Sequence, residues 1–114
     1  MLQYSVIELR RYLAPDGKDV FGDWLAKLRD ARAQAKIVVR LDRVAAGNFS
    51  DCKPLGAGLH ELRIDWGPGY RVYYALLGNS CVLLLAGGDK RKQASDIKRA
   101  AADFKDYKER TRIA

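Results

Sequence analysis

The sequence has few of the residues that build disulfide scaffolds and metal centres. It contains two cysteines, Cys52 and Cys81, and a single histidine, His60. Two cysteines are too few for a disulfide framework, and their spacing is not that of a zinc site. One histidine cannot supply the missing ligands. We therefore expect reduced thiols, no metal ion and no other cofactor.

Long apolar runs are also absent. No stretch of the 114 residues approaches the roughly 20 apolar residues that span a bilayer, and the segment Met1 to Val6 has no basic start like that of a secretion signal. With 48% hydrophobic residues, ten glycines and three prolines, the composition excludes low complexity and disorder. We expect a cytoplasmic protein that has no membrane partner and folds as a single domain over residues 1–114.

Positive charge is in excess. Twenty-one Lys and Arg oppose 14 Asp and Glu, which gives a formal net charge of +7. Residues 90–114 contribute most of it, with nine basic and four acidic side chains, a balance of +5. A basic surface of this kind favours binding to a polyanion, and nucleic acid is the first candidate. The alternative is a solvated helix face that the charges keep soluble.

The first half of the sequence indicates one strand and a helical hairpin. Tyr4 to Leu13 is rich in β-branched and aromatic residues and ends before the turn signal at residues 14–17. Apolar residues then recur at helical spacing from Asp19 to Leu28 and again from Ile37 to Ala45. Gly47-Asn48 suits the end of the second helix.

The second half indicates a β-meander. After a short strand near Cys52 to Leu55, residues 60–66 alternate between apolar and charged types, as in a half-buried antiparallel strand. Gly67-Pro68-Gly69 places Pro and Gly at the centre of a type II turn, and Tyr70 to Leu77 forms the returning strand. The apolar run from Cys81 to Ala86 predicts a central strand covered on both faces.

The chain ends in a predicted helix. Gly87-Gly88 is expected to stop the central strand, and apolar residues recur at helical spacing from Ser95 to Tyr107. Helices and strands are therefore segregated, which predicts an α+β fold with a mainly antiparallel sheet.

The chemically informative residues lie on the meander. If Leu62 and the strand residues at every second position from it face the core, Glu61, Arg63 and Asp65 lie on the other face, which we expect to be open. A matching register across the turn places Arg71 and Tyr73 beside them, and Lys53 and Lys90 reach the edge of that face. These side chains predict a cationic cleft whose arginines are exposed, so that removing Arg71 leaves folding intact.

A cationic cleft suits the cleavage of RNA, because RNA carries its own nucleophile in the 2′-hydroxyl. Arg63 and Arg71 are the candidates for binding the phosphate and stabilising the transition state. The general acid and base are to be found among five residues, which the spacing does not separate: Glu61, Tyr73, Lys53, Lys90 and His60.

Each residue also has a purely structural interpretation. Arg63 can form a cross-strand ion pair with Glu61 or Asp65 on a solvated face. The tyrosines can be ordinary strand formers, with Tyr73 as the one candidate for base stacking. His60 lies on the same strand face as the predicted core residues and is expected to be structural. Trp24 and Trp66 are predicted to be core residues.

Three segments together resemble a known family: residues 58–63 (Gly-Leu-His-Glu-Leu-Arg), residues 67–74 (Gly-Pro-Gly-Tyr-Arg-Val-Tyr-Tyr) and residues 83–90 (Leu-Leu-Leu-Ala-Gly-Gly-Asp-Lys), followed by Gln93 and Asp96-Ile97. This pattern resembles the HigB-like branch of the RelE/ParE toxin superfamily over nearly the whole chain. The resemblance implies an N-terminal strand, a helical hairpin packed on a sheet, a meander and a C-terminal helix.

The resemblance also implies a function. It implies ribosome-dependent cleavage of mRNA that inhibits translation, and neutralisation by a cognate antitoxin, often a helix-turn-helix DNA-binding protein. Arg63, Arg71 and Lys90 match the family's basic active-site residues most closely, and Lys53, Tyr73 and Gln93 match less closely. The histidine cluster and the C-terminal tyrosine of some members have no counterpart here, which leaves the acid and base roles open.

The predicted site combines both lines of reasoning. The catalytic candidates are Arg63, Arg71, Lys90, Tyr73 and Glu61, and the candidates for RNA binding are Lys53, Arg91, Lys92 and Gln93. The superfamily also includes gyrase poisons that act by binding, and fold alone does not separate them from nucleases. A third alternative is a non-toxic module that binds an antitoxin as corepressor.

Overall fold

The computed structural model describes residues 6–112, which form one five-stranded sheet and three α-helices. In chain order the elements are β1 (Glu8–Arg11), α1 (Val20–Lys27), α2 (Ala31–Ala45), β2 (Cys52–Gly56), β3 (Leu59–Ile64), β4 (Tyr70–Leu77), β5 (Cys81–Asp89), a 3₁₀ turn (Lys90–Lys92) and α3 (Gln93–Thr111). The strand order is β1-β5-β4-β3-β2, antiparallel except for the β1–β5 pair. The predicted α+β class is confirmed.

The first strand is shorter than the sequence indicates. Of the predicted span from Tyr4 to Leu13, β1 takes Glu8–Arg11 and Leu13 forms a single bridge to Asp19, while Tyr4 and Ser5 lie outside the described residues. Within residues 6–112, every helix is too short or too polar to cross a membrane. Cys52 and Cys81 are both free thiols.

Aspartate caps define the starts of the two helices in the predicted hairpin. The Asp19 side chain accepts a hydrogen bond from the backbone N–H of Gly22 at 2.9 Å and so opens α1. Asp30 accepts from the N–H groups of Arg32 and Ala33 at 2.9 and 3.2 Å and opens α2. Such caps satisfy backbone donors that the first helical turn leaves without partners. They explain why two helices, rather than one long helix, follow β1.

The meander forms, with Glu61, Arg63, Arg71 and Tyr73 on one face of the sheet as predicted, but its turn differs. Arg63 pairs with Arg71 and Glu61 pairs with Tyr73 across β3 and β4. The turn closes one residue earlier than predicted, because the N–H of Gly69 bonds to the carbonyl of Trp66 at 3.0 Å. Its central residues are therefore Gly67, with φ of +55°, and Pro68, and the loop between the paired residues Ile64 and Tyr70 has five residues.

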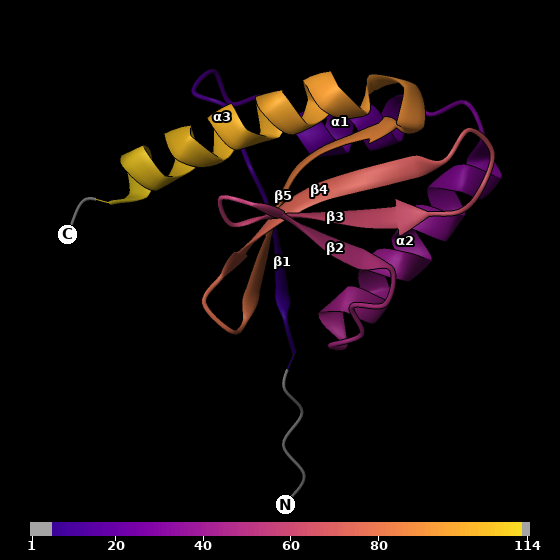
Figure 1. The fold of residues 1–114 in the computed structure, drawn as a ribbon, viewed down its shortest axis with the longest axis horizontal. Coiled ribbons are helices and arrows are strands. Elements are labelled where there is room, and N and C mark those ends of the chain that lie inside the picture. The colour runs from indigo at the N-terminus through magenta and orange to yellow at the C-terminus, as the bar shows by residue number, and fades with distance from the viewer. Residues whose placement is uncertain (1–5, 113–114) are drawn as a thin grey trace, which may run out of the picture.

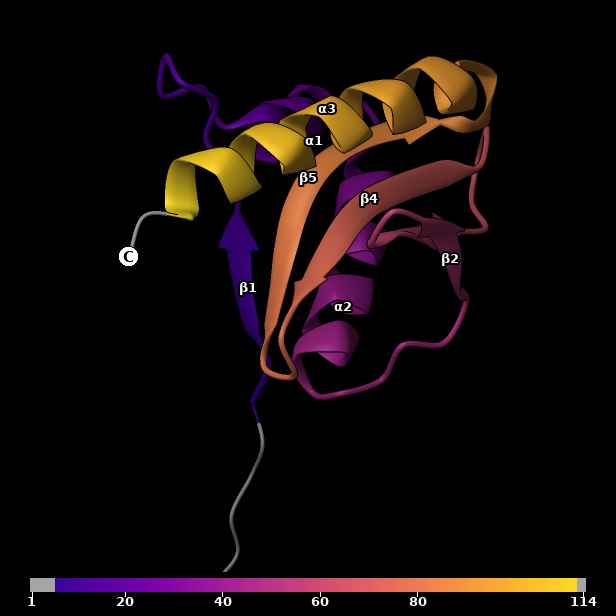
Figure 2. The ribbon, with the colours of Figure 1, turned by 60° about the vertical axis from the view of Figure 1, so that its left-hand side comes forward.

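Helices cover both faces of the sheet, and Figures 1 and 2 show α2 and α3 on opposite sides of it. One core lies between α1, α2 and the strand positions that include Leu62 and Tyr74. A second core lies beneath α3 and includes Tyr73 and Phe104. The expectation that Glu61, Tyr73 and Arg71 share an open face is therefore wrong. The helix after β5 packs on that face and covers Tyr73.

Strand β5 is an interior strand, as predicted, but the glycine pair does not end it. The strand continues through Gly87 and Gly88 to Asp89. A Cβ atom on Gly87 would lie 2.1 Å from a ring carbon of Trp24 in α1, and one on Gly88 would lie 2.0 Å from Oδ2 of Asp96 in α3. The two glycines therefore let a helix approach the strand closely on each face.

Replacing Gly87 with alanine should destabilise the fold by about 1 to 3 kcal/mol, because the new methyl group collides with the Trp24 ring. The change should appear as a lower urea midpoint in equilibrium unfolding. A Trp24→Ala background removes the obstacle, so Gly87→Ala should cost less in that background. Equal costs in the two backgrounds would show that the collision is not the cause.

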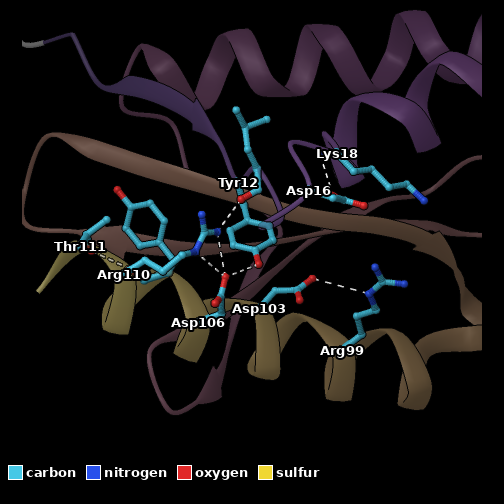
Figure 3. Close-up of polar contacts among 10 residues, drawn as sticks. Tyr12, Asp16, Lys18, Arg99, Asp103, Asp106, Arg110 and Thr111 are labelled. Atoms are coloured by element: carbon cyan, nitrogen blue, oxygen red, sulfur yellow. Dashed lines mark hydrogen bonds and ion pairs between the residues drawn. The ribbon is translucent and has the colours of Figure 1, made fainter.

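The C-terminal half of α3 is joined to the segment after β1 by a polar seam, which Figure 3 shows. The buried Tyr12 donates a hydrogen bond from its hydroxyl to Asp106 at 2.6 Å. Arg110 donates to Asp106 at 2.8 Å and to the Leu13 carbonyl at 2.6 Å. Burial, with the bond to Asp106, raises the pKa of Tyr12 to about 12, and the Tyr12 and Arg110 bonds lower the pKa of Asp106.

Asp103 lies beside this seam with a less favourable environment. One of its oxygens is buried without a hydrogen-bond partner among the described residues, and Arg99 is 3.6 Å away. Burial raises the pKa of the Asp103 carboxyl. A carboxyl with a raised pKa in the folded state makes its most favourable contribution to stability below the unfolded value of about 3.9 and loses it as pH rises. The ionised Asp103 is therefore a destabilising group at neutral pH.

Asp103→Asn should raise the thermal midpoint at pH 7 and lose this advantage as the buffer is acidified below about pH 4, where the wild-type carboxyl is also neutral. Thermal unfolding of both proteins from pH 3 to 8 would measure the difference. Asp106→Asn is the opposite control, because its lowered pKa makes the ionised form stabilising. A midpoint difference for Asp103→Asn that is constant with pH would contradict the assignment.

Candidate functional site

A buried carboxylate organises the site. Glu61 of β3 is 0% exposed, and three side chains converge on it. Its Oε2 accepts a hydrogen bond from Nε of Arg63 at 3.0 Å, and its Oε1 accepts one from Nε2 of Gln93 at 2.6 Å. Arg71 places its Nε 3.3 Å from Oε1, an ion-pair contact without a hydrogen bond. We call these four residues the arginine cluster.

The β3–β4 register assembles the cluster. Glu61 and Arg63 have the same parity on β3, and Arg71 lies directly across from Arg63 on β4, so all three side chains lie on the α3 side of the sheet. Gln93 is the first residue of α3 and reaches the Glu61 carboxylate from the helix side of the sheet. A buried carboxylate is tolerated when opposite charges and hydrogen bonds replace its water, which the two arginines and Gln93 supply here.

The two arginines differ in exposure. The Arg71 side chain is 12% exposed and also donates from Nη1 to the Gly69 carbonyl at 3.1 Å, whereas the Arg63 side chain is 47% exposed. Arg71 is thus clamped between Glu61 and the turn, and Arg63 extends toward solvent. The expectation of a fully exposed Arg71 is wrong, because Glu61 and α3 enclose it.

A groove of about 430 Å³ opens beside the cluster, and we call it the cleft. Its lining is Asp51, Arg63, Ile64, Asp65, Gly67, Pro68, Gly69, Tyr70, Arg71 and Lys90. Lys90 is exposed at the start of the 3₁₀ turn, which Asp89 caps through the Arg91 N–H at 2.9 Å. Arg63, Arg71 and Lys90, far apart in sequence, therefore line one groove in which three cations face two carboxylates.

Tyr73 is close to the cluster but closed to ligands. It is fully buried beneath α3, and its hydroxyl has no hydrogen-bond partner among the described residues. Burial, together with the charges of Glu61 and Asp96, raises its pKa to about 12. Tyr73 is therefore neutral at physiological pH and cannot stack on a base in this structure. The sequence interpretation missed this because strand parity does not reveal the helix above.

The other predicted residues are dispersed. Lys53 is exposed on the edge strand β2 opposite Glu61, and it does not line the cleft. Arg91 is exposed and pairs with Asp89 at 2.9 Å, and Lys92 is exposed at the end of the 3₁₀ turn. His60 faces the α2 side and stacks on Tyr74 with ring centroids 5.2 Å apart. Gln93 is turned inward onto Glu61 rather than toward a ligand.

Comparison with known proteins places the chain in a family. The model of the family described as "Phage derived protein Gp49-like (DUF891)" matches residues 23–107, which include the whole arginine cluster. The chain belongs to this Gp49-like family. The family is toxin-like and related to RelE and HigB, which confirms the coarser part of the predicted resemblance. Assignment to the HigB-like branch itself stays a prediction.

A relative of this Gp49-like chain occurs in Haemophilus influenzae. It is described as an uncharacterized protein and is 51% identical over 80 residues, which cover 70% of this chain and 81% of the relative.

Two residues of this Gp49-like chain contribute to the site without having been predicted from sequence. Arg40 of α2 donates from Nη1 to the Arg63 carbonyl at 2.7 Å and from Nη2 to the Ser50 carbonyl, so it ties β3 to the loop before β2. An arginine between Ile37 and Leu41, on the core side of α2, is the sequence signal that could have revealed it. Asp96 of α3 packs against Gly88, and burial raises its pKa.

Asp51 and Trp66 complete the surroundings of the cleft in this Gp49-like chain. Asp51 lies 3.8 Å from Nη1 of Arg40 and has a positive φ of 57°. Trp66, expected in the core, is only partly buried and donates from Nε1 to Asp30 at 2.9 Å. In the described region 6–112, no three His, Cys, Asp or Glu side chains are arranged to hold a metal ion.

Proposed function

We propose that this protein is the toxin of a type II toxin–antitoxin module and acts as a metal-independent endoribonuclease that cleaves mRNA on the ribosome. The observation that carries the proposal is the arginine cluster: one buried carboxylate orients two guanidinium groups beside an open cleft that Lys90 also lines. Membership of a toxin-like, RelE- and HigB-related family supports it.

The chemistry uses the RNA's own nucleophile. The 2′-hydroxyl attacks the adjacent phosphorus, its proton leaves, and the bond to the 5′-oxygen of the next nucleotide breaks to give a cyclic phosphate. Negative charge on the phosphoryl oxygens increases during this step, and Arg63 and Arg71 are positioned to stabilise it. Because Glu61 holds Arg71 before substrate arrives, little reorganisation is needed in the transition state.

The buried positions narrow the choice of proton-transfer residue. Both Glu61 oxygens are occupied, Tyr73 is enclosed beneath α3, and His60 lies on the other face of the sheet. Lys53 lies away from the cleft. We assign to Lys90 the proton that the leaving 5′-oxygen accepts, because Lys90 is the remaining one of the five candidates and lines the cleft. The base that receives the 2′-hydroxyl proton is unassigned.

An antitoxin and the ribosome are the proposed partners. The cleft is lined by three cations and by the small residues of the β3–β4 turn. This lining suits recognition of the phosphate backbone of a nucleic acid more than of its base sequence. The ribosome, by presenting the mRNA, would position the scissile phosphate in the cleft. The proposed antitoxin is a helix-turn-helix protein that covers or distorts the cleft.

Primer extension on cellular mRNA after brief induction of the protein tests this function. The expected result is new 5′ ends within translated regions, and none in a matched transcript whose start codon has been removed. Intact mRNA together with blocked DNA replication would replace the proposal with a gyrase poison. Normal growth with intact mRNA would replace it with a corepressor module.

A further inference from the structure

A basic stripe runs along the exposed side of α2, outside the cleft. Arg32, Lys36, Arg40 and Arg43 recur at intervals of three or four residues, which places them on one side of the helix. Arg40 is turned inward onto the Arg63 carbonyl, whereas the other three are exposed. The fold therefore uses one of these four cations and leaves three facing solvent.

A second groove follows this stripe and adjoins the cleft. It has a volume of about 410 Å³, and we call it the α2 groove. Its lining is Ala35, Lys36, Val39, Arg40, Arg43, Asp51, Ile64 and Asp65. Asp51, Ile64 and Asp65 line the cleft as well, so the two grooves lie next to each other. Together they are lined by six basic and two acidic side chains, a balance of +4.

Two cations of the α2 groove have no carboxylate partner in the described chain. Within residues 6–112, neither Lys36 nor Arg43 forms an ion pair, and Asp51 is already 3.8 Å from Arg40. The Lys36 ammonium lies over the ring of the partly buried Trp66, 4.5 Å from its centroid. A cation and an aromatic ring therefore lie side by side here, and these are the two kinds of group that bind single-stranded nucleic acid, through the phosphate and through stacking.

We infer that the α2 groove holds the flank of the single-stranded RNA whose scissile phosphate lies in the cleft. This inference rests on the proposed function, because it assumes that RNA occupies the cleft. Lys36 and Arg43 are seven residues apart, about 10 Å along the helix axis, so they contact separate phosphates. An acidic protein segment would also be attracted to the stripe, but the adjacency of the two grooves favours a strand that passes from one to the other.

The test measures binding without cleavage. Fluorescence anisotropy would report the affinity for 2′-O-methyl oligonucleotides, which lack the nucleophilic hydroxyl, at lengths of about 4 and about 12 nucleotides. The variant is Lys36→Ala/Arg43→Ala. The matched control is Lys98→Ala/Lys105→Ala, which also removes two exposed cations seven residues apart on a helix but none from either groove. Thermal unfolding would verify that both variants are folded.

The expected result is specific in length and in salt dependence. Lys36→Ala/Arg43→Ala should bind the long oligonucleotide more weakly. The negative slope of log affinity against log salt should become shallower by about 1.4, since each phosphate contact to a single strand contributes about 0.7 to its magnitude. The short oligonucleotide should be bound as by the wild type. The control variant should keep the wild-type slope.

Three outcomes would overturn the inference. An unchanged slope with the long oligonucleotide would assign the stripe to another partner, such as an acidic protein segment. An equal loss of affinity in the control variant would show that the effect comes from net charge alone. An equal change in salt slope for Lys36→Ala/Arg43→Ala with duplex RNA would indicate a structured RNA as the ligand instead. Because these probes cannot be cleaved, a failure of the proposed nuclease activity would leave this readout intact and would be recognised separately.

Discussion

Replacement of Arg71 by lysine should reduce mRNA cleavage by about 10²- to 10³-fold, the loss typical of removing one preorganised donor from a charged transition state. Arg71 contacts Glu61 through Nε and the Gly69 carbonyl through Nη1, so its planar fork is held in one orientation. A lysine keeps the positive charge near Glu61 but cannot make both contacts and present a second donor to the phosphate. Primer extension at matched protein levels measures the loss.

Lysine is preferred to alanine because Arg71 is 12% exposed rather than an exposed surface residue. Alanine would remove one of the two cations beside a buried carboxylate and would combine a loss of activity with a loss of stability. Arg91→Lys is the matched control, since Arg91 lies in the adjacent 3₁₀ turn with an 81% exposed side chain and does not line the cleft. Undiminished cleavage by Arg71→Lys would remove Arg71 from the proposed mechanism.

Replacement of Glu61 by alanine should lower the free energy of unfolding by about 3 to 5 kcal/mol, the range for removing one member of a buried ion pair. The substitution leaves Arg71 largely buried without its carboxylate and Gln93 without its acceptor. For a chain of this length, about 3 kcal/mol corresponds to a decrease in thermal midpoint of about 12 °C. Urea unfolding, with the slope verified as unchanged, measures the same quantity.

Glu61→Gln separates the charge from the hydrogen bonds. Glutamine has the same size and retains a carbonyl oxygen as acceptor, so it should lose less stability than alanine while its cleavage rate falls because the arginines are no longer held by a charge. Wild-type stability for Glu61→Ala would contradict the role assigned to the carboxylate. Wild-type cleavage by Glu61→Gln would show that the charge does not position Arg71.

Local patterns in the sequence were sufficient for the elements and for part of the site. The alternation after Gly69 predicted β4 over Tyr70–Leu77, as observed, and the same period of two predicted that Arg63 and Arg71 lie on one face of the sheet. These features depend on near neighbours in the chain, and a strand's two parities are fixed by backbone geometry. The convergence of two arginines on one side of a hairpin therefore follows from the sequence.

The environment of these residues did not follow from the sequence. Glu61 and Tyr73 were predicted on an open face, but alternation only divides residues between two faces and does not show what covers each. Gln93, 32 residues from Glu61, reaches the carboxylate because α3 folds back over the sheet. A charged residue in a strand indicates solvent only when no distant partner compensates its burial.

The sequence by itself therefore determined the basic character of the protein, its α+β elements and the placement of Arg63 and Arg71 on one face of the sheet, because these depend on composition and on local periodicity. The tertiary structure alone decided that α3 closes over Tyr73, that Glu61 is the buried anchor of the cluster, that Arg63 pairs with Arg71, and that the cleft adjoins the groove along α2. Those features depend on which surfaces meet when separated helices pack on the two faces of one sheet, and no local pattern encodes that choice.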